Sequence, residues 1–384
     1  MLRTKAVSSA VRVLVAGVLV AGVAVAITGC DGFFVDTHKT ASTTSSTGDY
    51  VYAVNSVSNT LTGYVVGTGT LTGITGAPYT LAINLGASSI AVTRDAKFVY
   101  AGGSGGIVCY SIGTAGALTA VSGGGATAQN SNFVSLDTSP DGTWLFGLDS
   151  VLQQLYVFQI NATTGALVPN TPLVVPTPTP GTPAARMVRI APNSALVAVA
   201  LSYGGDVLYT FNTTTGVLTQ SATIQTPSSA YFDNAVGFDS TSGYLLIGRG
   251  GASGTSGIQT YSVNSAGQPG SSPTFTASGN TPFSFLLDST GANLYVANRG
   301  DSTISGYGLT SGKLTPLAGS PYGSGSAVAG LVLDKTGKYV VSVGAGGGSD
   351  VTLYGFDAVT PARLDALTIA SSGSSGLIAI AATR

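Results

Sequence analysis

The sequence predicts an all-β fold, and three recurring features lead to that prediction. The first is a bulky residue that opens an apolar strand every 45 to 52 residues: Tyr50, Phe98, Trp144, Leu196, Tyr244, Leu294 and Tyr339. The second is a tyrosine in the strand that follows: Tyr64, Tyr110, Tyr156, Tyr209, Tyr261, Tyr307 and Tyr354. The third is a leucine that opens the fourth strand of each copy: Leu71, Leu118, Leu167, Leu218, Leu314 and Leu364, with Pro269 at this position in the fifth copy. Three markers that keep one phase over seven copies are typical of a seven-bladed β-propeller.

The sixth copy shows each part of the repeated unit. Its apolar run Phe283–Leu287 ends in the turn residues Asp288–Gly291, and a second apolar run, Leu294–Ala297, follows. The polar residues Asn298–Asp301 then interrupt the pattern before a third strand. This order of strands and turns predicts four-stranded antiparallel blades.

The first copy lacks an apolar strand in front of Tyr50, where the sequence is polar. In the other copies such a strand stands about ten residues earlier, as Ser89–Thr93 and Met187–Ile190 do. The missing strand is found at the other end of the chain, as Gly376–Ala381. We expect this C-terminal strand to pair into blade one and close the ring, which leaves only outer strand edges unpaired.

Residues 1–29 have the features of a bacterial lipoprotein signal peptide. Basic residues precede the apolar core Val13–Ile27, whose fifteen residues are few for a membrane span. The small residues before Cys30 match a lipoprotein cleavage box, so Cys30 is the expected lipidation site; an ordinary signal peptide or an uncleaved anchor is the alternative. Residues 30–48 form a Ser/Thr-rich tether that is too polar to fold, and residues 49–384 form the propeller.

Composition excludes several classes of function. The chain has no glutamate, and its one histidine, His38, lies in the tether, so neither a histidine metal site nor a cofactor is expected in the propeller. Without the signal peptide, 12 Lys and Arg oppose 16 Asp, a net charge of −4 with no basic stripe for nucleic acid. Cys109 has no second cysteine in the propeller and is expected to be a small buried residue.

Polar residues gather on one face of the predicted propeller. In this architecture the loops from second to third strands lie beside the residues that lead into the first strands. The candidate catalytic residues there are Arg299, Arg186 and Asp233, and the candidate ligand-binding residues are Asn298, Asp301, Arg249, Tyr231 and Asp149. Aspartates in the turns from first to second strands, such as Asp288 and Asp334, are expected to accept hydrogen bonds from backbone amides instead.

The run Asp288–Asp301, DSTGANLYVANRGD, and the turn Ser139–Gly142 resemble motifs of the seven-bladed propeller lactonases of the 6-phosphogluconolactonase type. The resemblance implies hydrolysis of a sugar-acid lactone, with Arg299 as the arginine of the NRG run. Arg186 matches the arginine of the family's Gly-Pro-Arg-His segment. In this chain, Met187 stands where that segment has its histidine. An aspartate such as Asp233 is then left to direct the attacking water.

Two functions therefore remain open at the level of sequence. The first is a membrane-tethered propeller that binds a small molecule or a partner in the bacterial cell envelope without catalysis. The second is a lactone hydrolase in which Arg299 and Arg186 hold the acid group or the developing oxyanion. In either case we expect a monomer that meets the membrane through its N-terminal lipid and does not bind nucleic acid.

Overall fold

The structure is a computed structural model that describes residues 48–81, 89–180, 182–251, 254–373 and 375–384. The chain divides into two compact units, Met1–Lys39 and Thr40–Arg384, and all described residues belong to the second. The predicted signal peptide, Cys30 and most of the tether lie outside the described residues. Among the described residues, no helix is long and apolar enough to cross a membrane.

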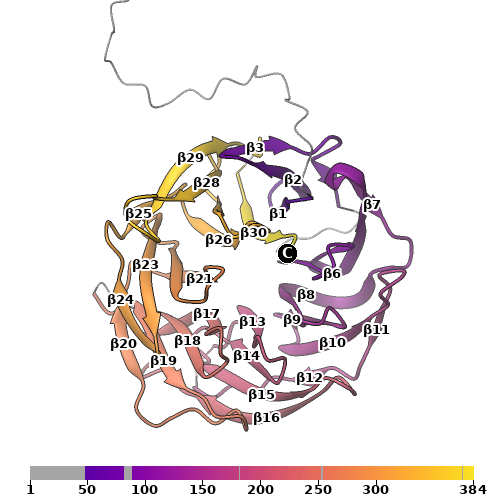
Figure 1. The fold of residues 1–384 in the computed structure, drawn as a ribbon. Helices are drawn as coiled ribbons and strands as arrows, with labels where there is room; N and C mark the ends of the chain where they lie inside the picture. Colours follow the sequence, from indigo (N-terminus) through magenta and orange to yellow (C-terminus); the bar gives the residue numbers. More distant parts are fainter. Residues whose placement is uncertain (1–47, 82–88, 181, 252–253, 374) are drawn as a thin grey trace, which may run out of the picture. The chain divides into compact units, whose positions relative to one another are not determined.

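Blades one to three are built from the N-terminal strands and one C-terminal strand (Figure 1). Blade one has the order β30 (Leu377–Ala382), β1 (Tyr50–Asn55), β2 (Thr60–Gly67) and β3 (Thr70–Gly73), with β4 (Tyr79–Thr80) also paired to β2. Blade two contains β5 (Ser89–Val92), β6 (Phe98–Ile112) and β7 (Leu118–Ala120). Blade three contains β8 (Ala126–Thr138), β9 (Trp144–Asp149), β10 (Gln154–Ile160) and β11 (Leu167–Pro169), with β12 (Leu173–Val174) also paired to β10. β8 also pairs with β6 and so joins blades two and three.

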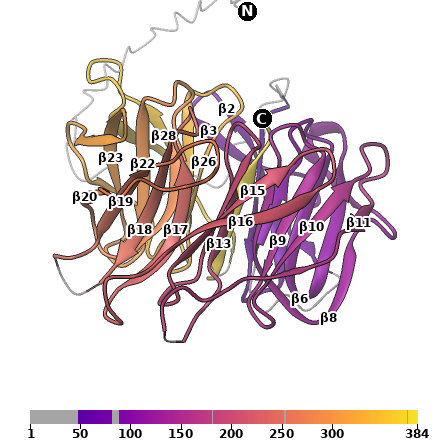
Figure 2. The same ribbon diagram turned by 90° about the horizontal axis from the view of Figure 1, so that it is seen from below.

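Blades four to seven repeat the same antiparallel order. Blade four contains β13 (Met187–Ile190), β14 (Leu196–Ala200), β15 (Asp206–Asn212) and β16 (Val217–Ile224). Blade five contains β17 (Phe232–Phe238), β18 (Tyr244–Gly250), β19 (Gly257–Ser262) and β20 (Thr274–Ala277). Blade six contains β21 (Pro282–Leu287), β22 (Asn293–Asn298), β23 (Thr303–Thr310) and β24 (Lys313–Pro316), with β25 (Tyr322–Gly323) also paired to β23. Blade seven contains β26 (Val328–Leu333), β27 (Tyr339–Gly344), β28 (Val351–Phe356) and β29 (Leu364–Ala370). Figure 2 shows the strands of neighbouring blades side by side.

The predicted closure of the ring is confirmed, because β30 pairs antiparallel with β1 from Val51↔Ala382 to Asn55↔Leu377. Thr383 extends this pairing by two hydrogen bonds. The Tyr50 amide donates to Thr383 Oγ1 at 2.9 Å, and the Thr383 amide donates to the Tyr50 carbonyl at 2.9 Å. The last strand of the chain is therefore the innermost strand of the first blade. The predicted all-β, seven-bladed propeller is confirmed with it.

Five of the seven third-strand tyrosines share one register, and Tyr156 departs from it. Tyr64, Tyr209, Tyr261, Tyr307 and Tyr354 each pair with the second residue of the second strand, as Tyr307 does with Leu294. In blade three it is Phe158 that occupies this position, opposite Leu145, whereas Tyr156 pairs with Gly147. Tyr156 is half-buried and Phe158 is buried. The expectation that all seven tyrosines are equivalent is thus wrong for Tyr156, which stands two residues out of phase.

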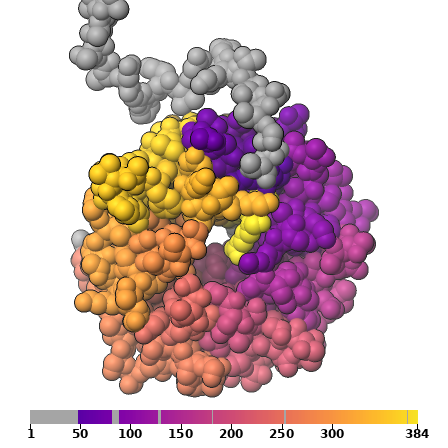
Figure 3. Space-filling model, in the orientation of Figure 1, coloured from indigo at the N-terminus to yellow at the C-terminus, as the bar shows by residue number. Residues whose placement is uncertain are grey.

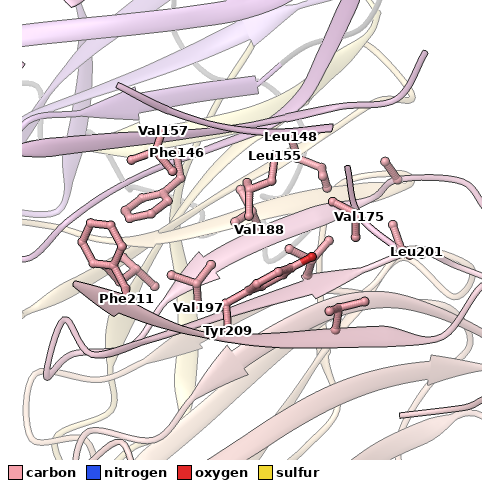
Figure 4. Packing of buried hydrophobic residues seen from close by; sticks show 14 of the residues in the cluster. Phe146, Leu148, Leu155, Val157, Val175, Val188, Val197, Leu201, Tyr209 and Phe211 are labelled. Carbon is pink, nitrogen blue, oxygen red and sulfur yellow. The ribbon is translucent and has the colours of Figure 1, made fainter. Parts of the chain in front are cut away.

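Apolar side chains fill the layers between blades. Between blades three and four, Phe146, Leu148 and Val157 meet Val197 and Tyr209, as Figure 4 shows. Tyr209 is fully buried. The sheet faces pack against one another in this way, and the innermost strands are left to surround the centre of the ring.

Candidate functional site

A channel of about 1030 Å³ runs along the centre of the ring. The innermost strand of every blade contributes to its wall: β30, β5, β8, β13, β17, β21 and β26. Figure 3 shows the molecule hollowed at this point. We call the end where these strands begin the upper mouth and the end where they finish the lower mouth. Side chains from all seven blades can therefore reach one ligand in this space.

Charges are unevenly divided between the channel and the rest of the surface. Residues 48–384 contain 11 Lys and Arg and 14 Asp. Six of the cations line the channel: Arg94, Arg186, Arg189, Arg299, Lys335 and Arg384. Only two of the aspartates do so, Asp137 and Asp334. An acidic domain thus has a basic channel, which attracts anions.

The two carboxylates of the described channel wall form no ion pair with these cations, and backbone amides donate to both. Asp137 accepts hydrogen bonds from the amides of Thr138 and Ile190, each at 3.0 Å. Asp334 accepts from the amides of Lys338 and Tyr339 at 2.7 and 2.6 Å, as expected for a turn aspartate. Ion pairs within the described part of the chain are Lys97–Asp95, Arg249–Asp233 and Arg363–Asp365, and none includes a channel cation.

Two of the predicted arginines come together at the upper mouth. Arg186 is exposed just before β13, and Arg299 is half-buried just after β22. The Arg299 guanidinium carbon lies 4.6 Å from the centre of the Phe283 ring, a cation–π contact that fixes its position. Burial, and then the charge of Arg186, lower the pKa of Arg299. The guanidinium groups therefore face the same space without a carboxylate between them.

Aromatic residues stand at the start of β17 in blade five, between the blades that carry the two arginines. Tyr231 precedes β17 and Phe232 is its first residue, and their rings lie on glycine backbone. A Cβ atom at Gly251 would be 3.1 Å from Tyr231 Cδ1, and one at Gly250 would be 2.1 Å from Phe232 Cε2. Tyr203, which is 40% exposed, stands with its ring centre 5.5 Å from that of Phe232. Flat aromatic rings beside cations suit a sugar ring that carries an acid group.

Asp233 and Arg249 lie beneath this surface and not on the channel wall. Both are buried, and the carboxylate of Asp233 receives Arg249 Nε at 2.8 Å and Nη2 at 2.9 Å. Asp206 is fully buried next to them; burial, and then the charge of Asp233, raise the pKa of Asp206 well above its usual value. A buried carboxyl group with a raised pKa beside a bidentate ion pair is a structural arrangement. It does not support the predicted role of Asp233 in directing water.

The other predicted ligand-binding residues are engaged in hydrogen bonds within the protein. Asn298 is buried and donates to Thr303 Oγ1 at 3.1 Å and to Ser305 Oγ at 2.8 Å. Asp301 is exposed, but its carboxylate accepts from the backbone and side-chain nitrogens of Asn280 at 2.6 and 2.8 Å.

Asp149 is also occupied. It is fully buried and accepts from the amides of Asn132, Val151 and Leu152 at 2.7, 2.9 and 3.1 Å. Asp149, Asn298 and Asp301 therefore hold loops in place. Of the predicted polar set, Arg186, Arg299 and Tyr231 are the ones left at the upper mouth.

Sequence reasoning missed four channel cations: Arg94, Arg189, Lys335 and Arg384. Arg189 carried a usable signal, since it interrupts the apolar strand Met187–Ile190 at the centre of a blade. A charged residue in an innermost strand has the channel as its nearest open space. Arg94, Lys335 and Arg384 carried no such signal, because they are exposed and follow the ends of innermost strands at the lower mouth.

Comparison with known proteins gives a consistent result. Residues 41–188 match the family described as lactonase, 7-bladed beta-propeller, whereas no curated protein matches the sequence. A putative 6-phosphogluconolactonase from Bacteroides uniformis has a similar structure, with a TM-score of 0.73 and 14% identity over 87% of this chain and 99% of that one. The periplasmic gluconolactonase PpgL of Pseudomonas aeruginosa gives a TM-score of 0.69 and 13% identity over 88% and 99%. At such identities the likeness shows a common fold.

Proposed function

We propose that this chain, which matches the lactonase propeller family over residues 41–188 and shares the fold of such proteins, hydrolyses lactones of sugar acids at the upper mouth of its channel. The observation that carries the proposal is the pair Arg186 and Arg299, which share that mouth without a carboxylate partner. The rings of Tyr231 and Phe232 supply the apolar surface against which a sugar ring would rest.

Lactone hydrolysis develops negative charge where these arginines stand. The oxygen of water forms a bond to the lactone carbonyl carbon, and the carbonyl oxygen becomes an oxyanion. The bond between that carbon and the ring oxygen then breaks, the ring oxygen takes a proton, and a carboxylate is left. Guanidinium groups hold an oxyanion and a carboxylate through paired charge-assisted hydrogen bonds. They therefore stabilise the transition state more than the neutral lactone.

Neither carboxylate among the described channel-lining residues is free of backbone hydrogen bonds and placed to take the proton from water. Asp137 and Asp334 are held by amides, and the only histidine, His38, precedes the propeller. We therefore assign the attack to hydroxide from solvent, drawn into a basic channel. The expected pH profile follows from this: log kcat/KM rises with a slope of about one from pH 6 to pH 9, without a plateau.

The test is hydrolysis of glucono-1,5-lactone above its spontaneous rate, measured by base uptake at constant pH. Arg299→Met is expected to lower kcat/KM by about 100-fold or more, the usual loss when an oxyanion donor is removed. The control is Lys313→Met, which removes a positive charge from β24, away from the channel. Equal rates for wild type and Arg299→Met, or no acceleration on any of a panel of sugar lactones, would contradict the proposal.

Binding of a sugar acid without turnover is the second candidate, and the occupied carboxylates of the channel wall favour it. The same arginine pair and aromatic rings would hold the ligand. Titration calorimetry with gluconate separates the two functions: binding that Arg299→Met abolishes, together with the spontaneous rate of lactone opening, identifies a binding protein.

We also propose that the propeller acts at a membrane of the bacterial cell envelope, tethered through residues 30–48 and a lipid on Cys30. The support comes from the sequence alone, with its basic front, apolar core and small residues before Cys30. Labelling cells with a radioactive fatty acid should mark the wild-type protein and leave Cys30→Ser unlabelled. Labelling of both proteins, or of neither, would contradict the anchor.

A further inference from the structure

Exposed cations surround one part of the lower mouth. They come from the turn between the first and second strands of blade two, from the same turn of blade seven, and from the residue two positions after β30 of blade one. β30 lies between β26 and β5, so the three blades are successive. We call these residues the basic sector: Arg94, Lys97, Lys335, Lys338 and Arg384.

The corresponding turns of the other blades carry no positive charge. Between the first and second strands of blades three to six, the turns are Ser139–Thr143, Ala191–Ala195, Asp239–Gly243 and Asp288–Ala292. Together they contain three aspartates and no lysine or arginine. The positive charges of these turns are therefore confined to the two blades that flank blade one.

The carboxylates of the basic sector are mostly turned inward. Asp49 and Asp334 are buried, and each accepts a hydrogen bond from a backbone amide, Asp49 at 3.2 Å and Asp334 at 2.6 Å. Asp95 is exposed and forms an ion pair with Lys97 at 3.1 Å. The other four cations form no ion pair within the described part of the chain, so the sector presents positive charge to solvent.

The chain also enters the propeller in this sector. Gly48 stands two residues before β1, and its carbonyl accepts from Thr383 Oγ1 at 3.2 Å, next to Arg384. A Cβ atom at Gly48 would be 4.0 Å from Lys335 Nζ. An anchor on the residues that precede Gly48 therefore brings the basic sector, and not the turns of blades three to six, towards the membrane.

We propose that the basic sector docks on the anionic headgroups of the membrane that holds the lipid on Cys30. The inference rests on the proposed anchor and is independent of lactone hydrolysis. Each lysine or arginine near an anionic lipid surface tightens binding by about five-fold, and tethering keeps the surface at a high effective concentration. The upper mouth, at the other end of the channel, then faces away from the membrane, where a soluble substrate can reach it.

The test measures which face lies near the lipid. The lipidated protein is reconstituted on vesicles of phosphatidylcholine, with or without phosphatidylglycerol, and carries a dye on one introduced cysteine; Cys109 is buried and does not compete. Thr68→Cys places the dye in the β2–β3 turn of the lower face, and Val151→Cys places it in the β9–β10 loop of the upper face; both positions are exposed. A nitroxide on the lipid headgroups should quench the dye in Thr68→Cys and not in Val151→Cys, and should do so only with phosphatidylglycerol.

Charge variants in the Thr68→Cys background identify the residues responsible. Lys335→Gln/Lys338→Gln should lower the ratio of docked to undocked protein by about ten-fold or more, and added salt should do the same in the unsubstituted sector. Lys313→Gln removes an exposed lysine of blade six outside the sector and should change the ratio by less than about two-fold. A ratio that falls equally in both variants, at unchanged melting temperatures, would overturn the assignment to this sector.

Flotation of the same vesicles separates failure of the docking surface from failure of the anchor. Protein that floats with both kinds of vesicle, but shows equal quenching of the two dyes or quenching that does not need phosphatidylglycerol, has an anchor and no docking surface. Protein that floats with neither would overturn the anchor and the docking surface together. Lactone hydrolysis, assayed with soluble substrate, is decided by neither result.

Discussion

Arg249 is the penultimate residue of β18 and Arg299 directly follows β22 in the neighbouring blade, yet the two have opposite surroundings. Tyr261 pairs with Leu245 and Tyr307 with Leu294, so Arg249 is equivalent to Asn298, and Arg299 is equivalent to Gly250. Successive residues of a strand point to opposite sides. That single step puts Arg249 in a buried ion pair with Asp233 and Arg299 at the channel without a carboxylate. The difference separates an arginine that stabilises the fold from one available to a ligand.

Breaking the buried pair should give the largest effect on stability. Arg249→Met leaves the Asp233 charge buried without its partner, beside Asp206, and we expect a loss of about 3 to 5 kcal/mol in the free energy of unfolding. Urea denaturation followed by tryptophan fluorescence measures it, since Trp144 is the only tryptophan. A loss of unfolding free energy below about 1 kcal/mol would mean that the Arg249–Asp233 pair does not stabilise the fold and that Arg249 and Arg299 do not differ in this respect.

Asp49 and Asp334 lie near the ring closure, and Asp49 allows a second, smaller measurement of how much an unpaired buried charge destabilises the fold. Asp49 is buried and accepts from the Lys335 amide at 3.2 Å; burial raises its pKa to about 7, and Asp334 adds to that rise. The folded pKa exceeds the usual 3.8, so the folded protein holds this proton more tightly than the unfolded chain does. The contribution of this bound proton to the stability of the folded protein is complete below about pH 4 and declines as the pH rises towards 7.

Asp49→Asn keeps a neutral group of the same shape at every pH. The wild type should therefore lose about 2 kcal/mol relative to this variant between pH 4 and pH 7, a value reduced from the full linkage to allow for solvent screening. Melting temperatures of the two proteins across this range provide the measurement. Parallel pH profiles would show that Asp49 ionises normally in the folded protein.

Removing the unpaired arginine should affect stability least. Arg299→Met relieves repulsion with Arg186 and loses one cation–π contact, so we expect a change within about 1 kcal/mol of unfolding free energy. The measurement is the same urea titration used for Arg249→Met. A loss as large as that of Arg249→Met would place Arg299 among the structural residues and remove it from the site.

Much of the fold was predictable because its causes are local and repeated. Turn residues and apolar runs recur with each blade, so the start of every second strand and the role of Gly376–Ala381 could be read from the sequence. The register of Tyr156 could not, since a tyrosine two residues out of phase still fits a strand pattern. Phe158 takes its place through cross-strand pairing that sequence spacing does not reveal.

The candidate site was predictable only in part. The loops that reach the upper mouth were identified, and with them Arg186 and Arg299. Sequence could not show that Asp233 would be paired with Arg249, or that amides would occupy Asp149, because both depend on contacts between segments. The lumenal position of Arg189 likewise depends on which strand of the blade is innermost.

Calorimetric titration of gluconate into the wild type and into Arg186→Met/Arg299→Met tests whether the unpaired arginines of the channel bind an anion. We expect saturable binding to the wild type and a loss of about 100-fold or more in affinity for the double variant, with the fold intact. Equal affinity in the two proteins, or no binding to the wild type, would contradict it.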